Sequence, residues 1–317
     1  MSVSEKIHIA LGTDDNYCKY AGCCIASILL SAQKEERLCF YVVDNGISEE
    51  NKARLVKLQT LRDHELIFLK PEMERLQDLP QCSYLGLSTY LRLLLPELLP
   101  DLDRLLYLDC DMIVTRPLSE LWKTDLAGKA AGVVEDYGEC FKEVREAEVL
   151  GIDFYFNAGM LLLDLKQIRE RALFRDVLSW TLANSEKIKF GDQDGLNVFL
   201  KNERFELPAC WNIQVNPFEQ EKHPDLSKRE AIKECRGIIH FVWTPKPDAF
   251  AYMNVQQEIF LKVLSKTPWA GEYEKGPLWK RIRKSVRRNR YYQIYRKHRI
   301  RIKKCVKRWI GKGEVPE

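Results

Sequence analysis

Two aspartates, Asp109 and Asp111, follow the apolar run at residues 104–108 with one residue between them. If the run is a strand, side chains two residues apart point to the same side, so both carboxylates leave the strand together. The two negatively charged carboxylates repel each other unless a cation binds between them. A hard divalent cation held by one or two carboxylates, with phosphate oxygens at its other positions, is the expected use of such a pair. His240, near the end of another apolar run, would add an imidazole and favour manganese over magnesium.

The Asp-x-Asp spacing is not specific by itself. At ordinary aspartate usage about one copy arises by chance in a chain of this length, and here Asp101 with Asp103 and Asp192 with Asp194 repeat it. The first of these pairs lies in a proline-flanked turn, where aspartate commonly serves turns and caps. The glycine patterns G-x-G-x-x-G and G-x-x-x-x-G-K are absent, so any phosphate chemistry must depend on a metal or on side chains.

Strand-like and helix-like segments alternate along the chain. Strands of nearly continuous apolar character, separated by helices, predict an α/β fold with a mostly parallel sheet and helices on both faces. In such sheets ligands bind beyond the carboxyl ends of the strands, which is where the aspartate pair would lie. We expect strands at residues 6–15, 38–46, 65–71, 104–109, 129–136, 158–165 and 237–243, and helices at residues 20–32, 48–61, 88–99, 173–186 and 192–200.

Length and composition indicate a globular protein with a substantial core. The chain has 317 residues, of which 45% are hydrophobic and 30% charged. No apolar run approaches the roughly 18 residues of a membrane span, and the first residues carry no signal-peptide core. We therefore expect a soluble, cytoplasmic protein.

The net charge of +4 hides a sharp division along the chain. Residues 275–312 contain 17 Lys and Arg and no Asp or Glu, which leaves 33 basic against 46 acidic residues elsewhere. Aromatic and aliphatic residues alternate with these charges at three- and four-residue steps, which indicates amphipathic helices that lie on an anionic membrane surface. Binding to nucleic acid, against which the acidic remainder of the chain argues, and a solvated tail are the alternatives. We predict a domain at 1–265, a linker at 266–278 and a membrane-association tail at 279–317.

From Ile7 to about Asp248 the chain resembles the family 8 glycosyltransferases. This retaining, sugar-nucleotide-dependent group includes bacterial lipooligosaccharide galactosyltransferases and glycogenin. The matching segments occur in the family's order and together cover most of the chain. They are ALGTDDNY, ISEENKA, STYLRL, YLDCDMIV, YFNAGMLLLDL, GDQDGLN and HFVWTPKP. The resemblance implies a Rossmann-like, nucleotide-sugar-binding fold of the glycosyltransferase A type.

The resemblance also implies roles at the metal and the diphosphate. Asp109, Asp111 and His240 would bind the metal, with diphosphate oxygens completing its shell. Lys246 would neutralise the leaving diphosphate, and Arg92 would approach the diphosphate or the sugar.

Further matched residues imply a nucleotide site and a sugar site. Asp14 and Asn16 would hold uracil and ribose, with loop capping as the alternative. For Asp192, which would line the transferred sugar, a helix N-cap is the alternative, and this residue would be able to cap the helix and contact the sugar at once. The residues that would line the transferred sugar, and that we take as the catalytic group, are Asp192, Gln193, Asp136 and Asn157.

These observations predict a manganese-dependent retaining hexosyltransferase, with magnesium as a possible substitute. It would move galactose or glucose from a UDP-sugar to a glycan acceptor, such as a lipopolysaccharide or lipooligosaccharide core or another membrane-linked glycan. It would work in the cytoplasm, at the inner face of the cell membrane. The alternatives are a metal-dependent nucleotidyltransferase or phosphoesterase, and a non-enzymatic protein that binds nucleic acid through the basic tail.

Two further expectations concern mechanism and a departure from the family pattern. A double displacement needs a nucleophile on the far face of the sugar, and Gln193 is a poor one, so we favour a front-face attack in which the departing phosphate helps to deprotonate the acceptor. The usual H-F-x-G-x-x-K-P-W reads HFVWTPKPD here, with Trp243 for the glycine and Asp248 for the tryptophan. Because that glycine allows close backbone approach to the diphosphate, the indole must point away or the loop must shift.

Overall fold

The computed structural model describes residues 5–80, 86–136, 150–216, 234–251 and 256–276. A seven-stranded sheet runs through it in the order β3-β2-β1-β4-β7-β6-β8. Neighbouring strands are parallel except where β7 pairs with β4 and with β6. The predicted α/β fold with a mostly parallel sheet is therefore confirmed. The strands are β1 (Lys6–Thr13), β2 (Arg37–Asp44), β3 (Glu65–Leu69), β4 (Arg104–Leu108), β6 (Ala131–Glu135), β7 (Phe156–Asp164) and β8 (Arg204–Glu206).

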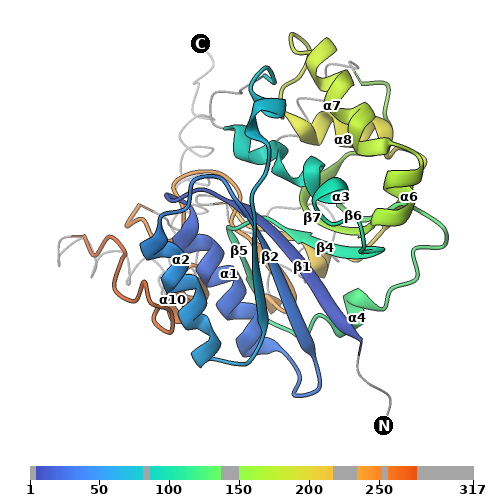
Figure 1. The fold of residues 1–317 in the computed structure, drawn as a ribbon. Helices are drawn as coiled ribbons and strands as arrows, with labels where there is room; N and C mark the ends of the chain where they lie inside the picture. The colour runs from blue at the N-terminus through green and yellow to red at the C-terminus, as the bar shows by residue number, and fades with distance from the viewer. Residues whose placement is uncertain (1–4, 81–85, 137–149, 217–233, 252–255, 277–317) are drawn as a thin grey trace, which may run out of the picture.

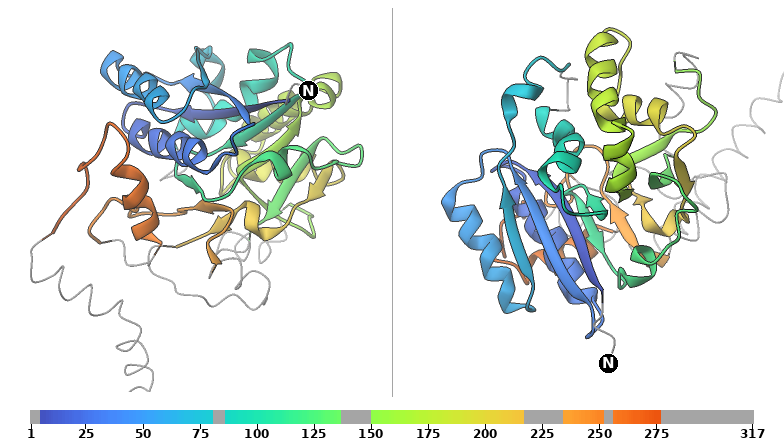
Figure 2. Two further views of the ribbon diagram at one scale, coloured as in Figure 1. Left: turned by 90° about the horizontal axis from the view of Figure 1, so that it is seen from below. Right: turned by 45° about the vertical axis from the view of Figure 1, so that its right-hand side comes forward.

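Helices cover both faces of this sheet (Figures 1 and 2). One face packs against α1 (Cys18–Ser31), α2 (Glu49–Val56), η1 (Lys57–Thr60), α4 (Ser119–Trp122) and α10 (Gln257–Leu264). The other face packs against η2 (Met73–Leu76), η3 (Leu87–Leu94), α3 (Leu95–Leu98), α6 (Leu165–Glu170), α7 (Leu173–Ala183) and α8 (Asp192–Phe199). None of the helices in the described part of the chain is long and apolar enough to cross a membrane.

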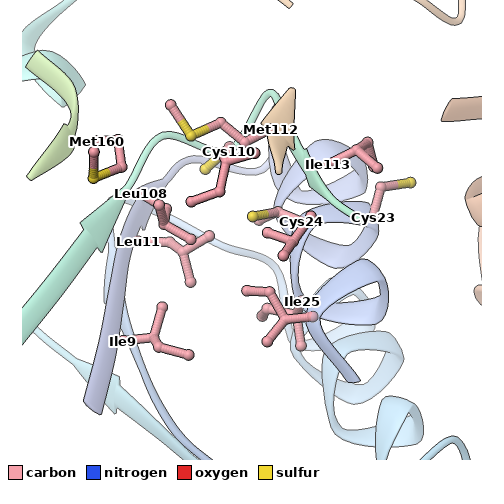
Figure 3. Close-up of a cluster of buried hydrophobic side chains, with 14 of the residues drawn as sticks. Ile9, Leu11, Cys23, Cys24, Ile25, Leu108, Cys110, Met112, Ile113 and Met160 are labelled. Atoms are coloured by element: carbon pink, nitrogen blue, oxygen red, sulfur yellow. The ribbon is translucent and has the colours of Figure 1, made fainter. Parts of the chain in front are cut away.

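The central strand β1 has a different core on each side, because successive side chains of a strand point in opposite directions. Ile9 and Leu11 join the cluster that includes α1, whereas Ala10 joins the cluster that includes η3. Figure 3 shows the first cluster, in which side chains from β1 and α1 face each other. Leu108 and Met112, on either side of the aspartate pair, are buried in it as well. Burial of each such side chain contributes about 1.5–3 kcal/mol, so the core holds the chain in place at the pair.

A second, three-stranded sheet has the order β5-β10-β9. Its strands are β5 (Met112–Val114), β9 (Ile213–Gln214) and β10 (Ile238–His240), and η4 (Ala209–Trp211) precedes β9. The middle strand β10 runs antiparallel to β5 and parallel to β9. Because β5 follows β4 after a three-residue connection, residues 109–111 form the junction between the two sheets. The turn that carries the aspartate pair is thus held at both ends.

The segment that follows α10 packs against α1. A Cβ at Gly22 of α1 would lie 2.3 Å from Cζ3 of Trp269, so only glycine leaves room for this indole. Trp269 is 2% exposed, and its Nε1 donates a hydrogen bond to Asn51 Oδ1 over 3.2 Å. Part of the predicted linker is therefore anchored on the domain. The predicted tail at 279–317 lies outside the described residues, and the domain boundaries stay predictions.

Local differences from the expected elements are small. Residues 88–99, expected as one helix, form the 3-10 helix η3 followed by the short α3. Pro96 lacks the amide hydrogen that a continuous α-helix would require at this point, so the α-helical turn begins next to it. The predicted cap at Ser48 is confirmed, because its side chain accepts a hydrogen bond from the amide of Asn51 at the start of α2.

Candidate functional site

A cavity of about 410 Å³ opens at the edge of the large sheet where β1, β4 and β6 end and β7 begins. This is the carboxyl edge of the parallel strands, as expected for a ligand site in an α/β sheet. All the predicted site residues except Asn16 line it. They arrive from both sheets and from α8, which begins beside the cavity.

Asp109, Asp111 and His240 meet on one wall of the cavity, with one ligand atom from each within 4.8 Å of the others. His240 Nε2 lies 3.3 Å from Asp111 Oδ1 and 3.9 Å from Asp109 Oδ2. The two carboxylates come together as predicted, but through a turn at residues 110–111 and not through an extended strand. β10 places the imidazole opposite them because it pairs with β5.

Two observations test whether this cluster fits a cation. Asp111 Oδ1 is buried, and apart from His240 Nε2 at 3.3 Å it has no hydrogen-bond partner among the described residues. Gly159 of β7 leaves space beside it, since a Cβ there would lie 2.4 Å from His240 Cε1 and 2.8 Å from Asp109 Oδ2. Two carboxylates and an imidazole are suitable ligands for Mn²⁺ and related divalent cations. The residues present therefore fit a divalent metal.

Lys246 neutralises part of the charge of this cluster. Its Nζ lies 2.5 Å from Asp111 Oδ2 and donates a hydrogen bond to the carbonyl of Phe241 over 3.0 Å. Burial raises the pKa of Asp111, but Lys246 and His240 outweigh it and hold this pKa well below its usual range. Burial alone would lower the pKa of Lys246, yet Asp111 raises it. Both groups are therefore charged at neutral pH.

Arg92 is buried behind the cavity and holds two acidic groups. Its Nε lies 2.8 Å from Asp192 Oδ2, and its Nη1 lies 3.3 Å from Asp109 Oδ1. The guanidinium also donates hydrogen bonds to the carbonyls of Ala158 and Thr89. Burial lowers the pKa of Arg92, but the two carboxylates raise it above its usual range. The side chain is thus a fixed positive charge between the metal cluster and α8.

Asp192 is the first residue of α8, and Gly191 occupies the N-cap position with a φ of 60°. The N-cap alternative for Asp192 is therefore wrong. A positive φ is easy for glycine. Asp192 Oδ1 accepts a hydrogen bond of 2.6 Å from the hydroxyl of Thr89. Burial raises the pKa of Asp192 to about 6 against the opposing effect of Arg92.

Gln193, Asn157 and Asp136 form a hydrogen-bonded group at the other side of the cavity. The amide of Ala158 donates to Gln193 Oε1 over 2.9 Å, which identifies that atom as the oxygen. Gln193 Nε2 and Asn157 Nδ2 then donate to Asp136 Oδ2 over 3.2 and 3.3 Å. The strand β7 thereby orients two amides around one buried carboxylate.

Residues 8–247 match the sequence model of glycosyl transferase family 8. The chain belongs to this family. Family 8 enzymes are retaining glycosyltransferases that use a nucleotide-sugar donor, a glycan acceptor and a divalent metal, and the predicted family and enzyme class are confirmed.

Curated relatives and solved structures agree with family 8. General stress protein A of Bacillus subtilis is 28% identical over 85% of this chain and 96% of its own length. A lipopolysaccharide 1,2-glucosyltransferase of Escherichia coli is 29% identical over 85% of this chain and 80% of its own. The galactosyltransferase LgtC, solved with donor and acceptor sugar analogues, superposes with a TM-score of 0.69 at 28% identity over 87% of this chain and 99% of its own. A second LgtC structure is of an active-site mutant in which a glutamine is replaced by glutamate.

The loop between β1 and α1 contributes less to the cavity of this family 8 member than predicted. Asp14 lines the cavity, and its Oδ1 accepts a hydrogen bond of 2.8 Å from the amide of Tyr17, so it also caps its loop. Asn16 is exposed and does not line the cavity, whereas Tyr17 does. The predicted role of Asn16 in holding the nucleotide stays a prediction.

The departure from the family 8 pattern is accommodated locally. Trp243 adopts a φ of 67°, the left-handed conformation that glycine favours, so the loop keeps a glycine-like backbone. Its indole packs against the cluster of Tyr155 and Phe190, while part of the residue lines the cavity. Asp248, in the place of the tryptophan, binds Lys19 over 2.5 Å and accepts a hydrogen bond of 2.6 Å from the hydroxyl of Tyr20. These contacts join the loop to α1.

Sequence reasoning missed several residues of the site. Tyr107 donates a hydrogen bond of 2.7 Å to Asp109 Oδ1, and its position two residues earlier on the same strand would have placed it on the same side. Gly159 lies within a segment that resembles the family, yet no spacing rule marks it. Asn212 and Gln214 reach the site only because β9 pairs with β10, and no local pattern reveals that contact.

Proposed function

We propose that the protein is a manganese-dependent retaining transferase that moves galactose or glucose from UDP to a glycan on a membrane-linked carrier, such as a lipopolysaccharide core. The observation that carries the proposal is the cluster of Asp109, Asp111 and His240 on the wall of the cavity. The names of the Escherichia coli relative and of LgtC support a hexose donor, and the former supports a lipopolysaccharide acceptor.

The proposed roles on the donor side follow from charge. A divalent cation held by Asp109, Asp111 and His240 would supply positive charge to the diphosphate as it departs. Lys246 adds a second positive charge at the same place. Arg92 holds Asp109 and Asp192 in position and carries its charge close to the diphosphate or sugar. Asp14 and Asn16, at the end of β1, would bind the nucleotide.

The proposed roles on the sugar side follow from hydrogen bonds. Asp192, Asp136, Asn157 and Gln193 would bind the hydroxyl groups of the transferred hexose. The oxygen of Gln193 already accepts a hydrogen bond from the Ala158 amide, so it does not face the cavity as a free nucleophile. We therefore favour front-face attack, with the departing phosphate accepting the proton of the acceptor hydroxyl. The active-site glutamine of LgtC supports a role for Gln193 in this pocket.

A panel of UDP-sugars, incubated with the protein and Mn²⁺, tests this function. We expect slow hydrolysis of UDP-galactose or UDP-glucose with release of UDP. Because Asp111 is a proposed ligand, Asp111→Asn should lower the rate by about a hundredfold or more. Asp101→Asn is the matched control, since Asp101 belongs to another Asp-x-Asp pair but lies exposed in a turn, and its rate should equal that of the wild type. Release of pyrophosphate or inorganic phosphate, or no UDP from any sugar, contradicts the proposal.

We also propose that the protein works in the cytoplasm at the inner face of the membrane, attached through residues 275–312. The support is the run of 17 basic residues without an acidic one. All but the first two residues of this segment lie outside the described part of the chain.

A further inference from the structure

Asn212 lies between the metal cluster and the sugar-binding group. It is not one of the residues proposed to bind the metal or the sugar. It follows η4 at the start of β9 and is fully buried, with 0% of its surface exposed. Its Nδ2 donates a hydrogen bond of 2.9 Å to Asn157 Oδ1. Its Oδ1 lies 3.1 Å from His240 Nδ1.

The backbone of β7 fixes the orientation of these side chains. A side-chain amide can be turned by 180°, but a backbone N–H can only donate. The amide of Gly159 donates to Asn157 Oδ1 over 3.1 Å, so this atom is the oxygen. The atom of Asn212 that faces it must then be the NH₂ group, because two oxygens would repel each other. The remaining atom of Asn212, next to His240, is therefore its oxygen.

An oxygen beside His240 Nδ1 decides which ring nitrogen carries the proton. The oxygen of Asn212 has no hydrogen to donate, so a hydrogen bond forms only if Nδ1 is protonated. In the neutral ring Nε2 then has a free lone pair, and this atom faces Asp111 and Asp109. A neutral imidazole with such a lone pair is the form that binds metals. In the other tautomer, Nε2–H would donate to the carboxylates and compete with a cation for their oxygens.

We propose that Asn212 is a positioning residue that sets the tautomer of His240, with its own orientation fixed through Asn157 by the backbone of β7. This inference rests on the metal site of the proposed function. The same Asn157 donates to Asp136 on the sugar side. A rotation of Asn157 would therefore disturb the metal ligand and the sugar-binding group together.

The first test is nitrogen-15 NMR of the metal-free protein in alkaline buffer. The chain has five histidines, so the His240 signals are assignable with a His240→Gln variant. We expect protonated Nδ1 in the wild type. Asn212→Leu, which removes the acceptor, should shift the signals towards protonated Nε2. Asn212→Thr, whose hydroxyl can donate to Asn157 Oδ1 and accept from Nδ1–H, should retain protonated Nδ1. His240 signals that are the same in the wild type and in Asn212→Leu overturn the proposal.

The second test is the affinity for Mn²⁺ alone, measured by electron paramagnetic resonance. Loss of a residue that orients a metal-ligating histidine typically costs about 10–100-fold in affinity, and we expect this for Asn212→Leu. Asn212→Thr, which keeps both a donor for Asn157 and an acceptor for His240, should recover most of the loss, which a general packing defect would not allow. Equal weakening in both variants overturns the proposal. If the wild type shows protonated Nδ1 but releases no UDP from any sugar, the proposed function fails and the tautomer inference stands.

Discussion

Asp192 is a buried carboxyl group whose pKa lies above its ordinary range, because burial outweighs the opposing effect of Arg92. Its pKa in the folded protein is raised to about 6. A raised pKa means that the folded protein binds the proton more tightly than the unfolded chain does. The stability from this group is therefore complete below about pH 4 and is lost as the pH rises through about 6.

The pH dependence of stability tests this assignment. Between pH 4 and pH 7, the free energy of unfolding of the wild type should fall by roughly 2–3 kcal/mol relative to that of Asp192→Asn. Urea unfolding of both proteins across this range measures the difference. The test compares how the difference in the free energy of unfolding between the wild type and the variant changes with pH. The absolute stability of the variant therefore does not affect the result. A difference that stays constant refutes the raised pKa.

The sequence reveals single residues where a local rule connects them. The spacing of Asp109 and Asp111 predicted that they share a side, and the structure brings both to the cavity, although a turn at residues 110–111 and not an extended chain does so. His240 joined them in the sequence analysis on ligand chemistry and on the family pattern, and the structure places it within reach of both. Asn212 could not be identified from the sequence, because its proposed function depends on a strand pairing between segments that no periodicity connects.

At the scale of elements, the close packing of β7 against the metal cluster gives a mutational prediction. A Cβ at Gly159 would meet His240 and Asp109, so Gly159→Ala should displace the ligands and weaken Mn²⁺ binding by about tenfold or more. Equilibrium titration with Mn²⁺ measures the loss.

Gly132→Ala is the matched control for this variant. Gly132 also lies in a strand, β6, and a Cβ there would lie 2.9 Å from Leu126 and 3.0 Å from Leu207, away from the cavity. Overpacking of this kind costs about 1–3 kcal/mol of stability. We expect Gly132→Ala to lower the melting temperature with unchanged Mn²⁺ affinity. Equal Mn²⁺ affinities in the two variants would show that Gly159 has no special relation to the site.

Long elements were predictable, and short ones were not. Each strand expected at residues 6–165 is present, because these strands have apolar runs of sufficient length. The three-residue β8 at the edge of the large sheet was not predicted. The small sheet was not predicted as a sheet, because β5, β9 and β10 have only two or three residues each, too few for a period to show. The antiparallel direction of β7 was missed for another reason, since a buried strand has the same apolar character in either direction.

At the scale of the whole molecule, the cavity and the basic segment are separate in the sequence, which makes their functions separable. Among the described residues, every one that lines the cavity precedes residue 247. A chain that ends at Glu274 should therefore keep its UDP-releasing activity and lose its affinity for anionic membranes. Flotation with phosphatidylglycerol vesicles measures the second property.

Vesicles of phosphatidylcholine are the control, because they lack the negative charge that attracts basic residues. Neither protein should float with them. Equal recovery of the full-length and shortened chains on anionic vesicles would exclude the basic segment as the attachment site.

The fold class was predictable as a whole because hydrophobic pattern and element order both favour it. The position of the cavity also followed from a general rule, since parallel strands present their carboxyl ends at one edge. The contacts that complete the site did not follow. The ion pair of Asp248 with Lys19 and its hydrogen bond with Tyr20, for example, join residues from opposite ends of the domain. Only the folded structure reveals these contacts.

The order of the metal-cluster residues along the chain has a consequence for biosynthesis. A ribosome delivers Asp109 and Asp111 first, and His240 only about 130 residues later. The strand that carries His240 is the middle one of the small sheet, so β5 lacks its neighbour until that strand has emerged. A nascent chain therefore cannot retain the proposed cation during most of its translation. Loading of the metal must come after nearly the entire domain has been synthesised and folded.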